Sequence, residues 1–237
     1  MKKNSISYFI HGTHIDHRIW EPILIKQINT LFCNIESCES RLVKWSGTNS
    51  TLARENAGEI LLDLISKDVS QCIPDTLNII GHSHGGTIAL MKSNELRTLL
   101  TKSTEINFIT INTPCIIEGP KLLDNKVNHF NIISIGDKVT PIAGFNKTGI
   151  INSEISNKTF IQKIIFGEFS YRKSLNSGEV GSIKSSFPDA INIYYKDQYW
   201  LRGLSPRTHF TKHRGYLRRN RLKWMPLLEK ALIIKNK

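Results

Sequence analysis

One serine in this chain lies in a setting that can make it a nucleophile. Residues 81–86 read GHSHGG, between a β-branched run and a helical pattern. They contain the spacing G-x-S-x-G, in which a serine occupies a strained turn between a strand and a helix while glycines relieve the crowding. A five-residue pattern recurs by chance in unrelated sequences, so it is the flanking strand and helix that make the interpretation specific. We therefore take Ser83 as the candidate nucleophile, the alternative being a glycine-rich turn without chemistry.

A nucleophilic serine needs a histidine to remove its proton and a carboxylate to orient that histidine. A strained strand-to-helix turn that carries a nucleophilic serine is called a nucleophile elbow, and in proteins with such an elbow the chain order is serine, acid, histidine. Asp137 follows a predicted strand at 130–135 and is the expected acid, although a plain turn aspartate would look the same. His213 and His209 both lie beyond the last predicted strand. We favour His213, because a helix follows it directly and can anchor its ring, and His209 stays open as the alternative base.

The oxyanion formed by such an attack needs preorganised donors, usually two backbone N–H groups. We expect one from His84, the residue after the nucleophile, and the other from the loop after an early strand. Residues 9–14 read FIHGTH at the end of such a strand. Gly12 lets the backbone turn inward there, and the N–H of Thr13 is the predicted second donor.

Short β-rich runs alternate with helical patterns along the chain, which is typical of βαβ units around a mostly parallel sheet with helices on both faces. The predicted strands are residues 6–10, 41–45, 76–80, 106–111, 130–135 and 190–195, and the predicted helices include 20–31, 51–65 and 87–100. Residues 216–234 also have helical spacing, and we expect Pro226 to divide them into two helices. Weak periodicity over 142–189 predicts a cap or lid insertion within a single domain spanning 1–237.

The composition is that of a globular protein with a sizeable core. Of 237 residues, 40% are hydrophobic and 22% charged, which excludes collagen, coiled coil and extensive disorder. The net charge of +12 is concentrated in residues 200–237, where Glu229 is the only acid. This asymmetry predicts attraction to an anionic membrane surface, or else a solvated helix face. Nucleic acid is a less expected partner, because few aromatic residues in the basic stretch could stack on bases.

The cell compartment is only loosely constrained. The apolar stretch 6–10 is shorter than the roughly 7–15 residues of a signal-peptide core, so we expect a cytoplasmic protein or one exported without a cleaved signal. No run reaches the roughly 18 apolar residues of a membrane span. The cysteines are scattered and predict reduced thiols, with one or two disulfides open in an oxidising compartment. They are Cys33, Cys38, Cys72 and Cys115.

Two other functions are alternatives to hydrolysis by a serine nucleophile. Histidines cluster around both motifs and suggest a metal-dependent hydrolase; they are His11, His14, His17, His82 and His84. Glycines follow His84 where such sites usually add a carboxylate, so we expect no metal and no cofactor. The second alternative is an inactive hydrolase scaffold that binds an acidic partner. A serine, an aspartate and a late histidine in the right order argue against it.

Three motifs together resemble the α/β-hydrolase superfamily: FIHGT at 9–13, WSGTNS at 45–50 with Arg54 downstream, and IGHSHGG at 80–86. More narrowly they resemble bacterial lipase- and esterase-like members, some of which are secreted antibacterial effectors. The resemblance covers residues 5–141. It implies a cofactor-free Ser-His-Asp hydrolase of carboxylic, lipid-like or small-molecule esters, and it leaves the substrate and the oligomeric state open.

The second of these motifs has two interpretations. Asn49 or Arg54 would order neighbouring loops or contact substrate, because the segment follows a strand whose end faces the active edge of an open sheet. Alternatively the segment is a plain helix start with Ser50 or Thr51 as its N-cap.

Overall fold

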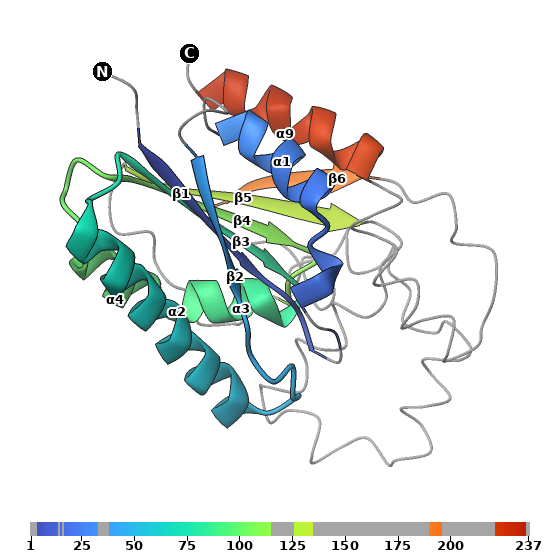
Figure 1. The fold of residues 1–237 in the computed structure, drawn as a ribbon. Coiled ribbons are helices and arrows are strands. Elements are labelled where there is room, and N and C mark those ends of the chain that lie inside the picture. The colour runs from blue at the N-terminus through green and yellow to red at the C-terminus, as the bar shows by residue number, and fades with distance from the viewer. Residues whose placement is uncertain are drawn as a thin grey trace, which may run out of the picture.

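One parallel sheet forms the centre of the molecule (Figure 1). The computed structural model describes residues 4–13, 15, 17–32, 38–114, 126–134, 190–195 and 221–235. Their strands are β1 (Ser5–Ile10), β2 (Cys38–Val43), β3 (Thr76–His82), β4 (Glu105–Ile111), β5 (Val127–Ser134) and β6 (Ile191–Tyr195). The order across the sheet is β2-β1-β3-β4-β5-β6, and every described pair of neighbours is parallel. The predicted α/β class with a mostly parallel sheet is confirmed.

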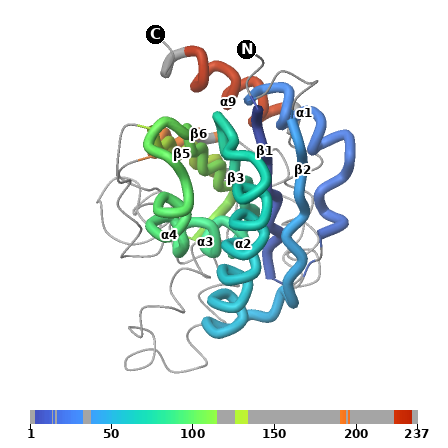
Figure 2. Tube along the Cα trace, turned by 60° about the vertical axis from the view of Figure 1, so that its left-hand side comes forward, coloured from blue at the N-terminus to red at the C-terminus, as the bar shows by residue number. Residues whose placement is uncertain are grey.

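Helices cover both faces of this sheet (Figures 1 and 2). The short turn η1 (His17–Ile19), α1 (Pro22–Phe32) and α9 (Arg221–Lys235) lie on one face. On the other lie α2 (Thr51–Gln71), α3 (His84–Met91) and α4 (Ser93–Thr98). Each face has its own apolar core, one including Phe9, Trp20 and Trp224 and the other including Ile79 and Phe108. Because helices cover both faces, β1, β3 and β4 are buried along almost their whole length, as is typical of strands in a parallel sheet.

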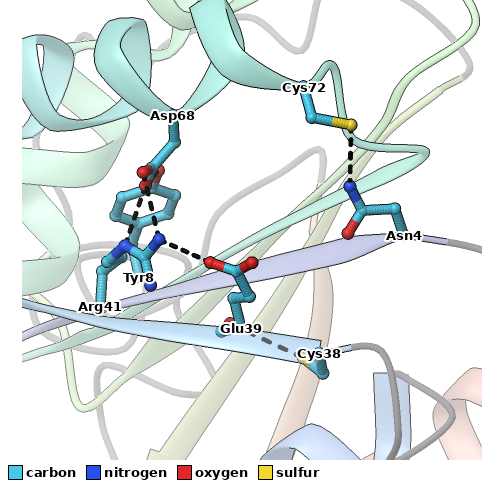
Figure 3. Close-up of polar contacts among 7 residues, drawn as sticks. All are labelled: Asn4, Tyr8, Cys38, Glu39, Arg41, Asp68 and Cys72. Atoms are coloured by element: carbon cyan, nitrogen blue, oxygen red, sulfur yellow. Dashed lines mark hydrogen bonds and ion pairs between the residues drawn. The ribbon is translucent and has the colours of Figure 1, made fainter.

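A buried phenol ties α2 to the sheet (Figure 3). The Tyr8 hydroxyl donates to Asp68 at 2.5 Å, and the Arg41 guanidinium donates to the same carboxylate at 3.1 Å. Burial, reinforced by the bond to Asp68, raises the pKa of Tyr8 above its ordinary value. The contact therefore connects β1, β2 and α2 through one carboxylate.

A row of side-chain amides crosses the sheet from β1 to β5. Asn78 donates to the Ser7 hydroxyl at 3.2 Å, Asn107 donates to Asn78 at 2.9 Å, and Asn128 donates to Asn107 at 2.8 Å. These are also the residues that the backbone register places opposite one another. A one-residue slip would break the row and leave buried amides unsatisfied, so the row helps to specify the register.

Several predicted elements have different bounds in the structure: β5 begins earlier than expected, at Val127, and α2 extends to Gln71. The second strand ends at Val43, so Trp45 lies in the loop after it rather than inside a strand. The helix expected over 87–100 begins earlier, at His84, and Lys92 separates it into α3 and α4. The backbone of Lys92, at φ −105° and ψ 10°, departs from helical values and ends α3.

The expected break at Pro226 is wrong, because α9 continues through this residue. Trp224, Leu228 and Ala231 are buried at the i, i+4 and i+7 spacing of one helical face. Their packing offsets the hydrogen bond that a proline removes from a helix interior. The proline itself is exposed.

Several sequence predictions lie outside the described residues, including the cap or lid at 142–189 and the thiols of Cys33 and Cys115. Of the other two cysteines, Cys72 is a free thiol that accepts a hydrogen bond from Asn4 at 3.3 Å, and Cys38 contacts the Ser7 hydroxyl at 3.5 Å. Within the described ranges, no helix has both the length and the apolar character needed to cross a membrane.

Candidate active site

The strand order makes the chain diverge at the carboxyl ends of β1 and β3. Because β1 lies between β2 and β3, the chain leaves β1 toward α1 on one face and leaves β3 toward α3 on the other. Ligands of open α/β sheets bind at the carboxyl ends of the strands where the chain diverges in this way. The two sequence motifs, at Gly12 and at Ser83, follow these two strands.

Ser83 has a strained backbone between β3 and α3. Its φ of 55° and ψ of −131° lie in a region that residues other than glycine rarely adopt. The strain is held by backbone bonds on both sides: the Ser83 N–H donates to Ile111 at 2.9 Å, and the Ser83 carbonyl accepts from Gly86 at 3.0 Å. Although the residue occupies the N-cap of α3, its side chain makes no capping hydrogen bond. The hydroxyl is thus not used to begin the helix.

The flanking glycines are required by close approach of backbone to backbone. A Cβ on Gly81 would lie 2.3 Å from the nitrogen of Gly86. A Cβ on Gly85 would lie 2.3 Å from the carbonyl oxygen of Ile10, at the end of β1. Both distances are below any real contact, so α3 can pack onto β3 and β1 only because side chains are missing here.

The loop after β1 touches the candidate nucleophile. A Cβ on Gly12 would lie 2.7 Å from the Cβ and 3.3 Å from the Oγ of Ser83. Thr13 occupies the turn that follows, and His84 is the first residue of α3. The first N–H groups of a helix have no acceptor within the helix, and they carry its positive dipole end. The structure therefore brings the segments of both predicted oxyanion donors beside Ser83.

An indole from the next loop supports this segment. The Nε1–H of Trp45 donates to the His11 carbonyl at 2.9 Å, and the two rings stack with centroids 5.3 Å apart and planes 20° apart. His11 itself is buried, with its Nδ1 at 2.9 Å from the Gly12 carbonyl oxygen. Sequence reasoning missed this contact because it placed Trp45 inside a strand. The available signal was an indole directly after the strand that neighbours the HG motif.

The rest of the WSGTNS motif builds the start of α2. The Ser50 side chain is the N-cap and accepts from the N–H of Ala53 at 3.1 Å. Arg54 is buried and donates to Asn49 at 3.1 Å and to Thr51 at 3.3 Å. Burial lowers the pKa of Arg54. The segment is thus a helix start and an ordered loop at once, and a contact of Asn49 or Arg54 with substrate stays a prediction.

A second residue with a positive φ lies beside the turn that carries Ser83. Asn112, directly after β4, has a φ of 47° and donates its N–H to the Ile132 carbonyl at 2.8 Å. Asparagine is among the few residues that adopt this left-handed conformation readily. The sequence Asn-Thr-Pro after a strand was the signal for such a turn, and sequence reasoning did not use it.

The other predicted catalytic residues lie outside the described residues; they are Asp137, His213 and the alternative base His209. His14 of the histidine cluster lies outside them as well. In the part of the chain that the structure describes, no three His, Cys, Asp or Glu side chains gather into a group that could hold a metal ion. The described site therefore consists of Ser83, His84 and the loop containing Gly12 and Thr13.

Comparisons with known proteins find remote likenesses in structure alone. No protein-family model matches the chain, and no curated protein matches it. A serine hydrolase of Xanthomonas campestris, described as having no lid, shares 11% identity over 94% of this chain and 84% of its own, with a TM-score of 0.45. An acetyl xylan esterase shares 11% identity over 96% of this chain and 98% of its own, with a TM-score of 0.41.

A third likeness is partial. An extracellular α/β-hydrolase from a Paenibacillus species shares 16% identity over 47% of this chain, with a TM-score of 0.35, and the match spans 42% of that protein's length. Since all of these similarities are low, the fold assignment rests on the chain's own geometry. The parallel strand order, its divergence at the ends of β1 and β3, and the strained serine between β3 and α3 give this chain the α/β-hydrolase fold.

Proposed function

We propose that this protein is a serine hydrolase that cleaves carboxylic esters, lipid-like esters among them, through an acyl-enzyme intermediate. The observation that carries the proposal is the strained backbone of Ser83 at the elbow, with a side chain that caps no helix and lies against the Gly12 loop. Strain of this kind persists only where the surrounding structure enforces it, and it gathers at functional sites.

In the proposed reaction, the Ser83 hydroxyl attacks the ester carbonyl while a histidine takes its proton. His213 is the proposed base, with His209 as the alternative, and Asp137 orients the ring and stabilises its charged form. The N–H groups of Thr13 and His84 hold the oxyanion of the tetrahedral intermediate. The histidine then returns the proton to the leaving alcohol, and water hydrolyses the acyl-enzyme by the same steps.

The basic segment suggests where the substrate is presented. Residues 200–237 contain eleven Lys and Arg and a single acid, and α9 begins within this segment. The proposal is that this charge concentrates the enzyme at an anionic lipid surface, where each basic residue contributes about 1 kcal/mol.

The test compares Ser83→Ala with Ser93→Ala, since Ser93 is also a buried serine in the same region and its hydroxyl makes no hydrogen bond in the described structure. With p-nitrophenyl butyrate, Ser83→Ala should lose several orders of magnitude in kcat, as removal of a triad member does. It should also stop reacting with a fluorophosphonate. The Ser93→Ala control should keep both properties, and both variants should show the parent's circular dichroism.

Fluorophosphonate labelling that persists in Ser83→Ala would overturn the proposal. A parent protein that neither reacts with the probe nor hydrolyses the ester would instead favour an inactive scaffold.

A further inference from the structure

We infer that Trp45 is a positioning residue of the oxyanion hole. This inference rests on the proposed function, and it assigns a role to the Trp45 side chain, which reaches from the WSGTNS motif to the loop after β1. The contact joins residues 34 positions apart in the sequence, at the ends of neighbouring parallel strands.

The His11 carbonyl is the point that this contact holds. Trp45 donates its Nε1–H to this oxygen at 2.9 Å, and the indole also stacks on the His11 ring. The elbow approaches the same oxygen, because a Cβ on Gly85 would lie 2.7 Å from it. The peptide between His11 and Gly12 is therefore held between the indole and the backbone of α3.

Fixing this peptide orients the next one, which carries the Thr13 N–H. A peptide unit is planar, so only the two dihedral angles at Gly12 separate the held carbonyl from the proposed donor. Glycine has the widest conformational freedom of any residue, and without support its dihedral angles would vary. Trp45 supplies part of that support. Its indole acts through the backbone of His11 and needs no contact with the substrate.

The loop that carries Trp45 is itself braced. Ser50 caps α2, and the buried Arg54 donates to Asn49 and Thr51 at the start of that helix. The Ser46 hydroxyl also accepts from the N–H of Thr48 at 3.2 Å. The indole is thus delivered by a short, internally bonded segment, which is the kind of supporting shell that keeps a catalytic geometry within narrow limits.

The main test variant is Trp45→Phe, which keeps an aromatic ring but removes the N–H donor. The control is Trp20→Phe, because Trp20 is more deeply buried than Trp45 and its Nε1 makes no hydrogen bond within the described residues. A third variant, Trp45→Leu, removes both the donor and the stacked ring. Each is assayed with p-nitrophenyl butyrate, for kcat and KM separately, at a temperature at least 15 degrees below its own melting midpoint.

Loss of one direct oxyanion donor costs about 100- to 1,000-fold in kcat. A donor that is present but misplaced should cost less, so we expect kcat of Trp45→Phe to fall about 10- to 100-fold with KM within about twofold. Trp45→Leu should fall further. Affinity for an alkyl trifluoromethyl ketone, whose adduct with Ser83 places an oxyanion in the hole, should weaken by the same factor as kcat.

Equal kcat in Trp45→Phe and in the parent would overturn the inference, as would a loss no larger than that of Trp20→Phe. A change in KM alone would also overturn it, since substrate binding would then be affected and not the oxyanion. If Trp45→Leu does not fold, the Phe variant decides the question. Failure of the proposed function is distinguishable, because it would appear either as a parent that does not hydrolyse the ester or as hydrolysis that does not depend on Ser83.

Discussion

Adding one methyl group at Gly12 should push the loop after β1, which carries the proposed oxyanion donor Thr13, away from Ser83. The new carbon of Gly12→Ala would lie 2.7 Å from the Cβ of Ser83 and 3.0 Å from the carbonyl oxygen of His82, where ordinary contact begins at 3.4 Å. Neither atom can swing aside easily. Ser83 is held by its backbone bond to Ile111, and the His82 oxygen is itself part of the backbone.

The size of the effect follows from this shortfall of about 0.7 Å. Because a misplacement of about 1 Å costs about 100-fold in rate, kcat should fall about 10- to 100-fold. Overpacking costs about 1–3 kcal/mol, and the reduced freedom of the unfolded chain offsets about 0.4–1 kcal/mol of it. The net cost is therefore up to about 2.6 kcal/mol. Because a protein of this length loses about 2–4 °C of Tm per kcal/mol, a decrease of up to about 10 °C is expected.

A second glycine provides the control. In Gly58→Ala the new carbon would also lie 2.7 Å from another atom, but that atom is the Cε of Lys92, and the next nearest atoms, at 2.9 and 3.3 Å, belong to the same side chain and not to backbone. Gly58 lies inside α2, where alanine favours the helix by about 0.5–1 kcal/mol. This variant should keep the parent's kcat and its Tm, or melt slightly higher. Stopped-assay kinetics on p-nitrophenyl butyrate and calorimetric melting measure both quantities.

The outcome for Gly12→Ala separates packing from catalysis. A variant that melts lower but hydrolyses the ester at the parent's kcat would show that the contact between the loop and Ser83 serves stability alone. The assignment of Thr13 as an oxyanion donor would then be refuted.

Further predictions concern ionisation, the base and the membrane surface. The pKa of Tyr8 is raised in the folded state, so above about pH 10 the unfolded chain loses this proton first, and the free energy of unfolding should fall by about 1.4 kcal/mol per pH unit. In urea unfolding, Tyr8→Phe should be less stable than the parent at pH 8, but its free energy of unfolding should fall less steeply from pH 10 to 11. Equal slopes in the two proteins would contradict this prediction. If His213 is the base, His213→Ala should lose as much kcat as Ser83→Ala while His209→Ala keeps substantial activity, and the reverse result would transfer the role to His209. Reversing the charges of Arg218, Arg219 and Arg221 should slow hydrolysis on anionic phospholipid vesicles and spare a small soluble ester; unchanged vesicle activity would leave the basic segment as a solvated helix face.

Much of the fold could be predicted from the sequence because its signals are local. Alternating apolar runs and turn residues located all the described strands to within a few residues, and the β-branched run before GHSHGG identified the elbow. The boundaries were less predictable. The extension of α2 to Gln71 includes the i, i+4 pair of Lys67 with Asp63 at 2.7 Å, a weak interaction that adds to partial burial of Val69.

By itself, then, the sequence determined the α/β class, the strained serine between β3 and α3, and the glycines that such a turn needs, since all of these depend on residues close together in the chain. Only the tertiary structure decided which segments meet. It placed Trp45 on the His11 carbonyl, aligned Ser7 with Asn78 across 71 positions, and kept α9 intact through Pro226. These contacts depend on strand order and on packing between distant segments, which no local pattern encodes. The physical reason is that a hydrogen bond or a close backbone approach is set by three-dimensional proximity, whereas propensity and periodicity act within a single element.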